Sequence, residues 1–122
     1  MDAVFFEQAD TEHFSGGTYA KALNVVIEHE NVRGRTTFVE MNKLQHYNTP
    51  LKVFIGYASD ERDAAVWLKG YGEIIRDADI FGDIATHRRQ LVIFGDLPSE
   101  GHCWTFHTYE PTGFTPLPDL RV

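Results

Sequence analysis

The chain has 122 residues, a length typical of one domain, and 43% of them are hydrophobic, which is enough for one compact core. Eleven lysines and arginines stand against eighteen aspartates and glutamates, so the formal net charge is −7. Because proteins that coat nucleic acid are usually basic, this charge argues against a plain coating role. It does not exclude an enzyme that holds metal ions with its own carboxylates.

Three further features bear on the compartment. No apolar run approaches the ~18 residues that a membrane helix needs, so we expect no membrane contact. The first residues have no basic segment ahead of their apolar stretch, unlike a signal peptide. Cys103 is the only cysteine, which excludes an intrachain disulfide and a zinc site built from cysteines. These features predict a cytoplasmic protein.

The first half of the chain begins with two predicted strands. We expect them over residues 2–8 and 23–29, joined by a polar hairpin loop over residues 9–20 with Ser15-Gly16-Gly17 at its centre. The second strand has a nearly continuous apolar run, which is typical of a central strand covered on both faces.

After a turn, a helix is predicted over residues 37–47. Thr37 and Glu40 have capping-box spacing, which indicates its start, and Asn48-Thr49-Pro50 ends it. A strand is expected over residues 51–57. Ser59 with the acidic residues behind it predicts a second helix, which Gly70 and Gly72 weaken and which residues 73–79 continue.

Two more strands are expected over residues 90–94 and 102–109, and the proline-containing tail after them is predicted to be loop. The order β-β-α-β-α-β-β predicts an α/β (α+β) fold in one domain, with a mixed β-sheet flanked by two helices.

Carboxylates gather at the end of the second strand. Glu28 and Glu30 are two residues apart and therefore share a face, directly after a run that looks buried. If the hairpin loop centres near Ser15, paired residue numbers add up to about 30, which sets Asp2 beside Glu28. Two or three carboxylates at such a point suit a hard cation such as Mg²⁺.

The pattern resembles the PD-(D/E)XK nuclease superfamily, the fold of many restriction and repair nucleases. The resemblance rests on the strand Asp2-Ala3-Val4-Phe5-Phe6, the strand Val25-Val26-Ile27-Glu28-His29-Glu30, a helix with Glu40 and Lys43, and the strand that follows Pro50. It covers about residues 1–60. It implies a restriction-endonuclease-like core that lacks its first helix, so that helix is lost, is replaced by another chain, or is missing from a truncated or degenerate member.

The resemblance implies site residues and a mechanism. Asp2 and Glu28 look like the metal ligands, and Glu30 stands where a lysine is usual, as a third ligand or a general base. Lys43 would then take the place of that lysine. Mg²⁺ or Mn²⁺ would polarise a phosphoryl oxygen and lower the pKa of a bound water, while Lys43 steadies the developing charge during DNA cleavage.

Each of these residues also has a structural interpretation. Asp2 would be an exposed terminal residue, Glu28 and Glu30 the solvated end of a strand, and Glu40 with Lys43 a surface ion pair. Two other functions therefore stay open: a catalytically inactive member of the same fold, or an unrelated acidic α/β binding protein. A domain that lacks a core helix also has a reason to form a homodimer that covers exposed sheet.

Overall fold

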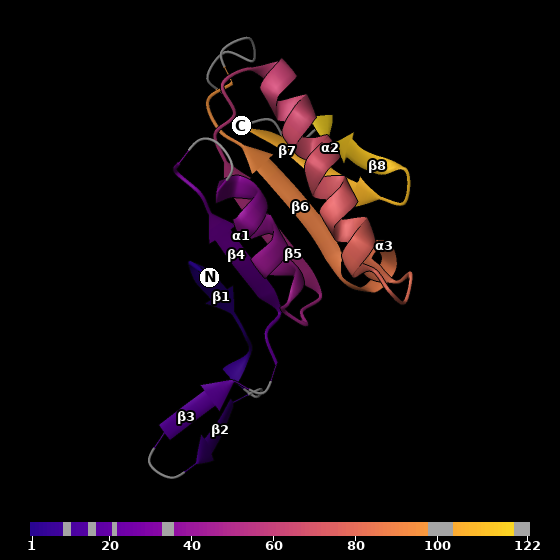
Figure 1. The fold of residues 1–122 in the computed structure, drawn as a ribbon. Coiled ribbons are helices and arrows are strands. Elements are labelled where there is room, and N and C mark those ends of the chain that lie inside the picture. The colour runs from indigo at the N-terminus through magenta and orange to yellow at the C-terminus, as the bar shows by residue number, and fades with distance from the viewer. Residues whose placement is uncertain (9–10, 15–16, 21, 33–35, 98–103, 119–122) are drawn as a thin grey trace.

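The computed structural model describes residues 1–8, 11–14, 17–20, 22–32, 36–97 and 104–118, which form an α+β fold (Figure 1). These residues build a six-stranded mixed sheet, a separate two-stranded hairpin and three helices. The strands of the sheet, in spatial order, are β1 (Ala3–Phe5), β4 (Val25–His29), β5 (Leu51–Gly56), β6 (Arg89–Phe94), β7 (Thr105–Glu110) and β8 (Gly113–Pro116). The hairpin of β2 (Thr11–Phe14) and β3 (Gly17–Ala20) projects away from this sheet.

The centre of the sheet is parallel and its sides are antiparallel. β4, β5 and β6 run in the same direction, whereas β1 pairs antiparallel with β4, and β7 and β8 continue antiparallel from β6. Parallel neighbours need long crossover connections. Here α1 (Thr36–Gln45) connects β4 to β5, and α2 (Glu61–Ala78) with α3 (Ile84–His87) connects β5 to β6.

One face of the sheet carries the hydrophobic core. Figure 1 shows α1 and α2 on the same face, and the strand residues beneath them are fully buried: Val26, Phe54, Val92 and Phe94 are all 0% exposed. On the opposite face the neighbouring strand residues Ile27, Ile55 and Ile93 are only partly buried. In the part of the chain that the structure describes, no helix covers this second face, which we call the open face.

Helix α2 forms because its capping and its apolar spacing agree. The side chain of Asp60 accepts a hydrogen bond from the amide of Asp63 at 2.8 Å, which satisfies one of the free donors at the helix start. Trp67, Tyr71 and Ile75 recur every four residues and are buried, so one stripe of the helix faces the sheet. The packing of this stripe against the sheet stabilises the helix despite the low helix propensity of Gly70 and Gly72.

The predicted mixed sheet and both predicted long helices are present, but three local predictions were wrong. The segment 9–20 is not a plain loop, because its described residues pair as β2 and β3. The tail is not all loop either: Gly113, at φ +127°, lets the chain turn back, and Phe114 packs edge-on against Tyr109 at 5.6 Å. The first strand is shorter than predicted, and of the last strand His102 and Cys103 lie outside the described residues.

Candidate functional site

The pairing of β1 with β4 follows the register expected from the sequence. Ala3 pairs with Ile27 and Val4 with Val26, so Asp2 lies beside the end of β4. The Asp2 amide donates to the carbonyl of Ile27 at 3.0 Å. The carboxylate oxygen Oδ2 of Asp2 accepts a hydrogen bond from the amide of His29 at 2.6 Å. Asp2 is therefore fixed to the carboxyl end of β4 through both its backbone and its side chain.

Glu28 is a buried carboxylate on the helix-covered face of the sheet. Only 3% of it is exposed, and its neighbour in register on β5 is Phe54. An ionised carboxylate in such surroundings requires a positive partner. In this structure the partner is the amino group of Met1, whose nitrogen lies 2.5 Å from Oε1. The hydrogen bond and the charge of Glu28 raise the pKa of that amino group.

The other two predicted residues have local partners. Oε1 of Glu30 accepts a hydrogen bond from the amide of Val32 at 2.7 Å, which stabilises the turn after β4. Lys43 forms an ion pair with Glu40, three residues earlier on α1, at 2.6 Å. The hydrogen bond from Lys43 to Glu40 raises the pKa of Lys43, and the charges of Glu28 and Glu30 raise it further. Lys43 is thus within electrostatic reach of both glutamates.

The described residues contain no group of three His, Cys, Asp or Glu side chains that could hold a metal ion. Two of the three predicted ligands, Asp2 and Glu30, use carboxylate oxygens to accept hydrogen bonds from backbone amides. Asp2 and Glu28 remain the two carboxylates to consider for Mg²⁺, because this ion often takes only one or two protein carboxylates and fills its other positions with water and substrate phosphate. Their oxygens are the hard donors that the ion prefers.

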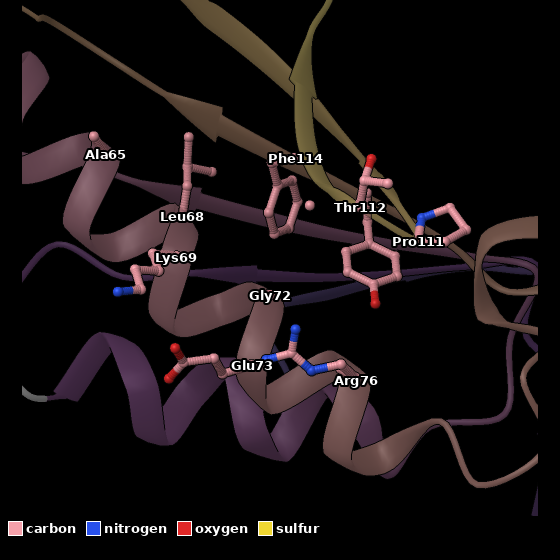
Figure 2. A pocket seen from close by; sticks show the side chains of 11 residues that line it. Ala65, Leu68, Lys69, Gly72, Glu73, Arg76, Pro111, Thr112 and Phe114 are labelled. Atoms are coloured by element: carbon pink, nitrogen blue, oxygen red, sulfur yellow. The ribbon is translucent and has the colours of Figure 1, made fainter.

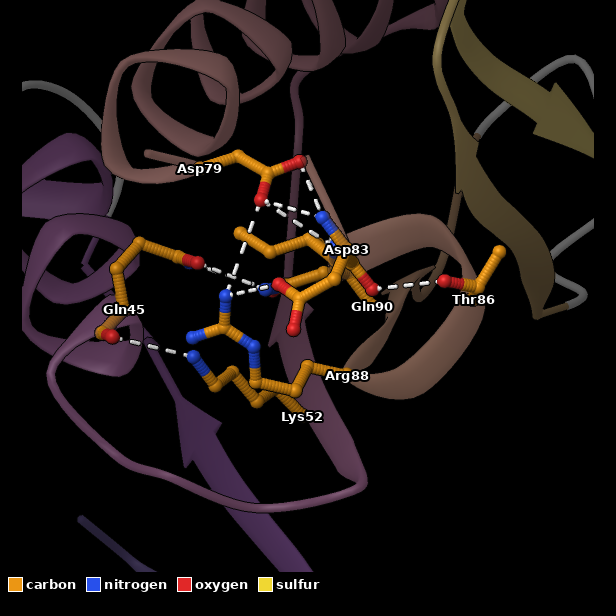
Figure 3. A network of polar contacts seen from close by, with 8 residues as sticks. Gln45, Lys52, Asp79, Asp83, Thr86, Arg88 and Gln90 are labelled. Atoms are coloured by element: carbon orange, nitrogen blue, oxygen red, sulfur yellow. Dashed lines mark hydrogen bonds and ion pairs between the residues drawn. The ribbon is translucent and has the colours of Figure 1, made fainter. Parts of the chain in front are cut away.

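A second polar cluster lies at the opposite ends of the parallel strands, around Lys52 (Figure 3). Lys52 is 0% exposed, and its Nζ donates to the carbonyl of Gln45 at 3.1 Å. The side chains of Gln45 and Gln90 bond to each other beside it at 2.7 and 3.2 Å. Burial, and to a smaller degree the charge of Arg88, lower the pKa of Lys52 to about 8.

Arg88 is held at this cluster by two aspartates. It pairs closely with Asp83 and lies 3.8 Å from Asp79, as the dashed lines in Figure 3 show. Its hydrogen bond and charge lower the pKa of Asp83. Lys52 was not among the site residues predicted from the sequence, although its alternation with Phe54 along β5 places a lysine on the core face. Arg88 is the central residue of the basic run His87-Arg88-Arg89, and its ion pairs give it a structural role here.

The hollow in Figure 2, about 440 Å³, lies between α2 and the β7–β8 hairpin. Lys69, Glu73 and Arg76 line it from the helix, and Tyr109 and Phe114 line it from the hairpin. Burial raises the pKa of Tyr109. The described residues that line this hollow bring no carboxylate pair together, so we place the candidate site at Asp2 and Glu28.

Comparisons with protein-family models, with curated proteins and with solved structures found no match to this chain. Among the described helices, none combines the length and the apolar character needed to cross a membrane.

Proposed function

We propose that the carboxyl end of β4 is a metal-dependent phosphodiesterase site of the PD-(D/E)XK nuclease type, acting on nucleic acid. The observation that carries the proposal is the pairing of β1 with β4, whose register sets Asp2 beside Glu28, a residue with a buried carboxylate. The strand order β1-β4-β5, with α1 between β4 and β5, supports the proposal, because the resemblance implies an Asp strand beside a Glu strand, followed by a helix and a further strand.

The charge of Glu28 supports a cation site at this point. A buried carboxylate is costly without a positive partner, and the amino group of Met1 takes that role at 2.5 Å. A divalent ion held by Asp2 and Glu28 would meet the same need with oxygen ligands. When bound, Mg²⁺ or Mn²⁺ would act as a Lewis acid on a phosphoryl oxygen and make a water molecule more acidic.

The other residues of the site have roles that follow from their positions. The amide of His29 holds the carboxylate of Asp2 in one orientation, so less ordering is needed when a ligand binds. Lys43 is an exposed ammonium group on α1 that can neutralise charge on a phosphate. Glu30, at the turn after β4, has a carboxylate that can accept a proton from an attacking water.

The test is a plasmid-nicking assay in Mg²⁺ or Mn²⁺ with the wild type and Glu28→Gln. Glutamine keeps the shape of the side chain and removes its charge. We expect cleavage to fall about a hundredfold or more, the scale seen when one group that stabilises transition-state charge is lost. Glu73→Gln, which removes a carboxylate from the exposed side of α2, is the matched control and should cleave as the wild type does.

A Mn²⁺ titration followed by thermal unfolding distinguishes the remaining outcomes. If Mn²⁺ stabilises the wild type but not Glu28→Gln, and neither protein cleaves, the chain is an inactive member that keeps its ion site. If Mn²⁺ stabilises neither protein and neither cleaves, Glu28 serves only the ion pair with Met1 and the proposed function is wrong.

A further inference from the structure

Three aromatic rings form a row on the open face of the sheet, at the carboxyl ends of β4 and β5 and just before β7. We call His29, Tyr57 and Trp104 the aromatic row. The ring centres of His29 and Tyr57 are 5.7 Å apart, and those of Tyr57 and Trp104 are 5.9 Å apart. Nε2 of His29 and the hydroxyl of Tyr57 lie 3.1 Å apart, within hydrogen-bond distance. Contacts from neighbour to neighbour thus order the row.

Gly95 allows the last two rings of the row to meet. A Cβ atom at this position would lie 2.7 Å from the ring of Tyr57 and 2.7 Å from that of Trp104. Both distances are too short for any side chain, so only glycine lets the two rings close over the backbone that follows β6. The arrangement therefore depends on a specific residue at the end of a third strand.

We propose that the aromatic row stacks the bases of a single-stranded nucleic acid whose backbone reaches the candidate site. The proposal rests on the proposed function for the class of ligand. The row lies at the same end of β4 as that site but on the opposite face of the sheet: the amide of His29 bonds to the carboxylate of Asp2, while the side chains of Glu28 and His29 point to opposite faces. A nucleic-acid strand cut at Asp2 and Glu28 would pass over the carboxyl end of β4, and its next nucleotides would then lie over the three rings.

Exposure distinguishes these rings from core aromatics. The protein has two tryptophans: Trp67 is 5% exposed in the core, whereas Trp104 is 37% exposed. His29 is also exposed. Every base has a flat π-face, so exposed rings bind unpaired bases with little sequence preference. In a duplex the bases already stack on one another and are not free to do so.

The net charge of −7 favours stacking over phosphate binding as the source of affinity. Each phosphate that a protein neutralises steepens the fall of affinity with salt. An acidic chain that binds through rings should therefore show weak binding and a shallow salt dependence. This sets the row apart from a basic groove that follows the phosphate backbone.

The experiment measures binding of a fluorescein-labelled twelve-nucleotide oligothymidylate by anisotropy in EDTA, where no cleavage occurs. We expect Trp104→Ala and Tyr57→Ala each to weaken binding between about 5- and 150-fold, the range for loss of one base–ring stack. Phe81→Ala removes an 80% exposed aromatic ring on the α2–α3 connection and is the matched control, with no expected change. In a Trp67→Phe background, the oligonucleotide should quench the emission of Trp104.

The row is not a base platform if Trp104→Ala binds as tightly as the wild type, or if a duplex of the same length competes equally well. The proposal is also wrong if the emission maximum of Trp104 shifts with protein concentration but does not respond to the oligonucleotide, since the row is then buried between two copies of the chain. Glu28→Gln should still bind the oligonucleotide. A wild type that binds the oligonucleotide but cleaves nothing in Mg²⁺ or Mn²⁺ therefore overturns the proposed function alone, and a wild type that cleaves while Trp104→Ala binds unchanged overturns the row alone.

Discussion

Replacing Lys52 with methionine should stabilise the protein by about 1–2 kcal/mol at pH 7. Burial lowers the pKa of this lysine to about 8 from 10.5, which corresponds to roughly 3 kcal/mol of cost for folding with the charged form. Methionine fills similar space without a charge. The variant loses the hydrogen bond from Nζ to the carbonyl of Gln45, which offsets about 1–2 kcal/mol of the gain.

The dependence on pH has a definite sign. Below pH 8 Lys52 is protonated in both the folded and the unfolded chain, and the cost of burying the charge is fully present. Between pH 8 and 10.5 the folded state loses the proton first, so the unfolded state binds more protons and the stability of the wild type rises. The methionine variant lacks this rise. Its advantage should shrink by about 3 kcal/mol across this window and reverse to a small disadvantage at the top.

Urea unfolding of both proteins from pH 7 to 10.5 measures this difference. Burial also raises the pKa of Tyr71, so stability falls above pH 10 as the unfolded tyrosine ionises, but both proteins share this effect and it cancels. Lys69→Met, at an exposed lysine on α2, is the control and should follow the wild type at every pH. A gap between Lys52→Met and the wild type that stays constant with pH would mean that Lys52 is not buried as a charge.

The sequence predicted the parts of the fold in which local pattern and tertiary packing agree. The apolar run ending at Ile27 became a central strand, and the residues from Ser59 onward became a long helix. The hairpin of β2 and β3 and the strand β8 were missed, because their polar residues give no core-facing alternation. They form through pairing with a neighbouring strand and through the turn at Gly113, which propensity alone does not reveal.

At the candidate site the sequence predicted the register that sets Asp2 beside Glu28. It did not predict what each carboxylate binds. Hydrogen bonds from the amides of His29 and Val32 to Asp2 and Glu30 depend on where the backbone ends a strand or turns, and no residue pattern encodes that. The aromatic row was missed for a similar reason: its rings are far apart in the sequence, and Tyr57 and Trp104 meet only because residue 95 is a glycine.

Two glycines on α2 should respond to alanine in opposite directions. A Cβ atom at Gly70 would overlap the ring of Phe38, which comes from α1 and packs edge-on against Tyr71 at 5.4 Å. At Gly72 nothing lies within 4 Å of such an atom. Alanine improves the helix by up to about 1 kcal/mol at both positions. Only at Gly70 must a packed ring move, which typically costs 1–3 kcal/mol.

We therefore expect Gly70→Ala to lower the free energy of unfolding by about 1–2 kcal/mol and Gly72→Ala to raise it by up to about 1 kcal/mol. Urea unfolding of both variants measures the two values, and each variant is the control for the helix-propensity gain of the other. The double variant Phe38→Ala with Gly70→Ala tests the cause: without the ring, the added methyl group should stabilise the helix relative to Phe38→Ala alone. If it still destabilises, the contact between α1 and α2 at Gly70 is not what requires glycine there.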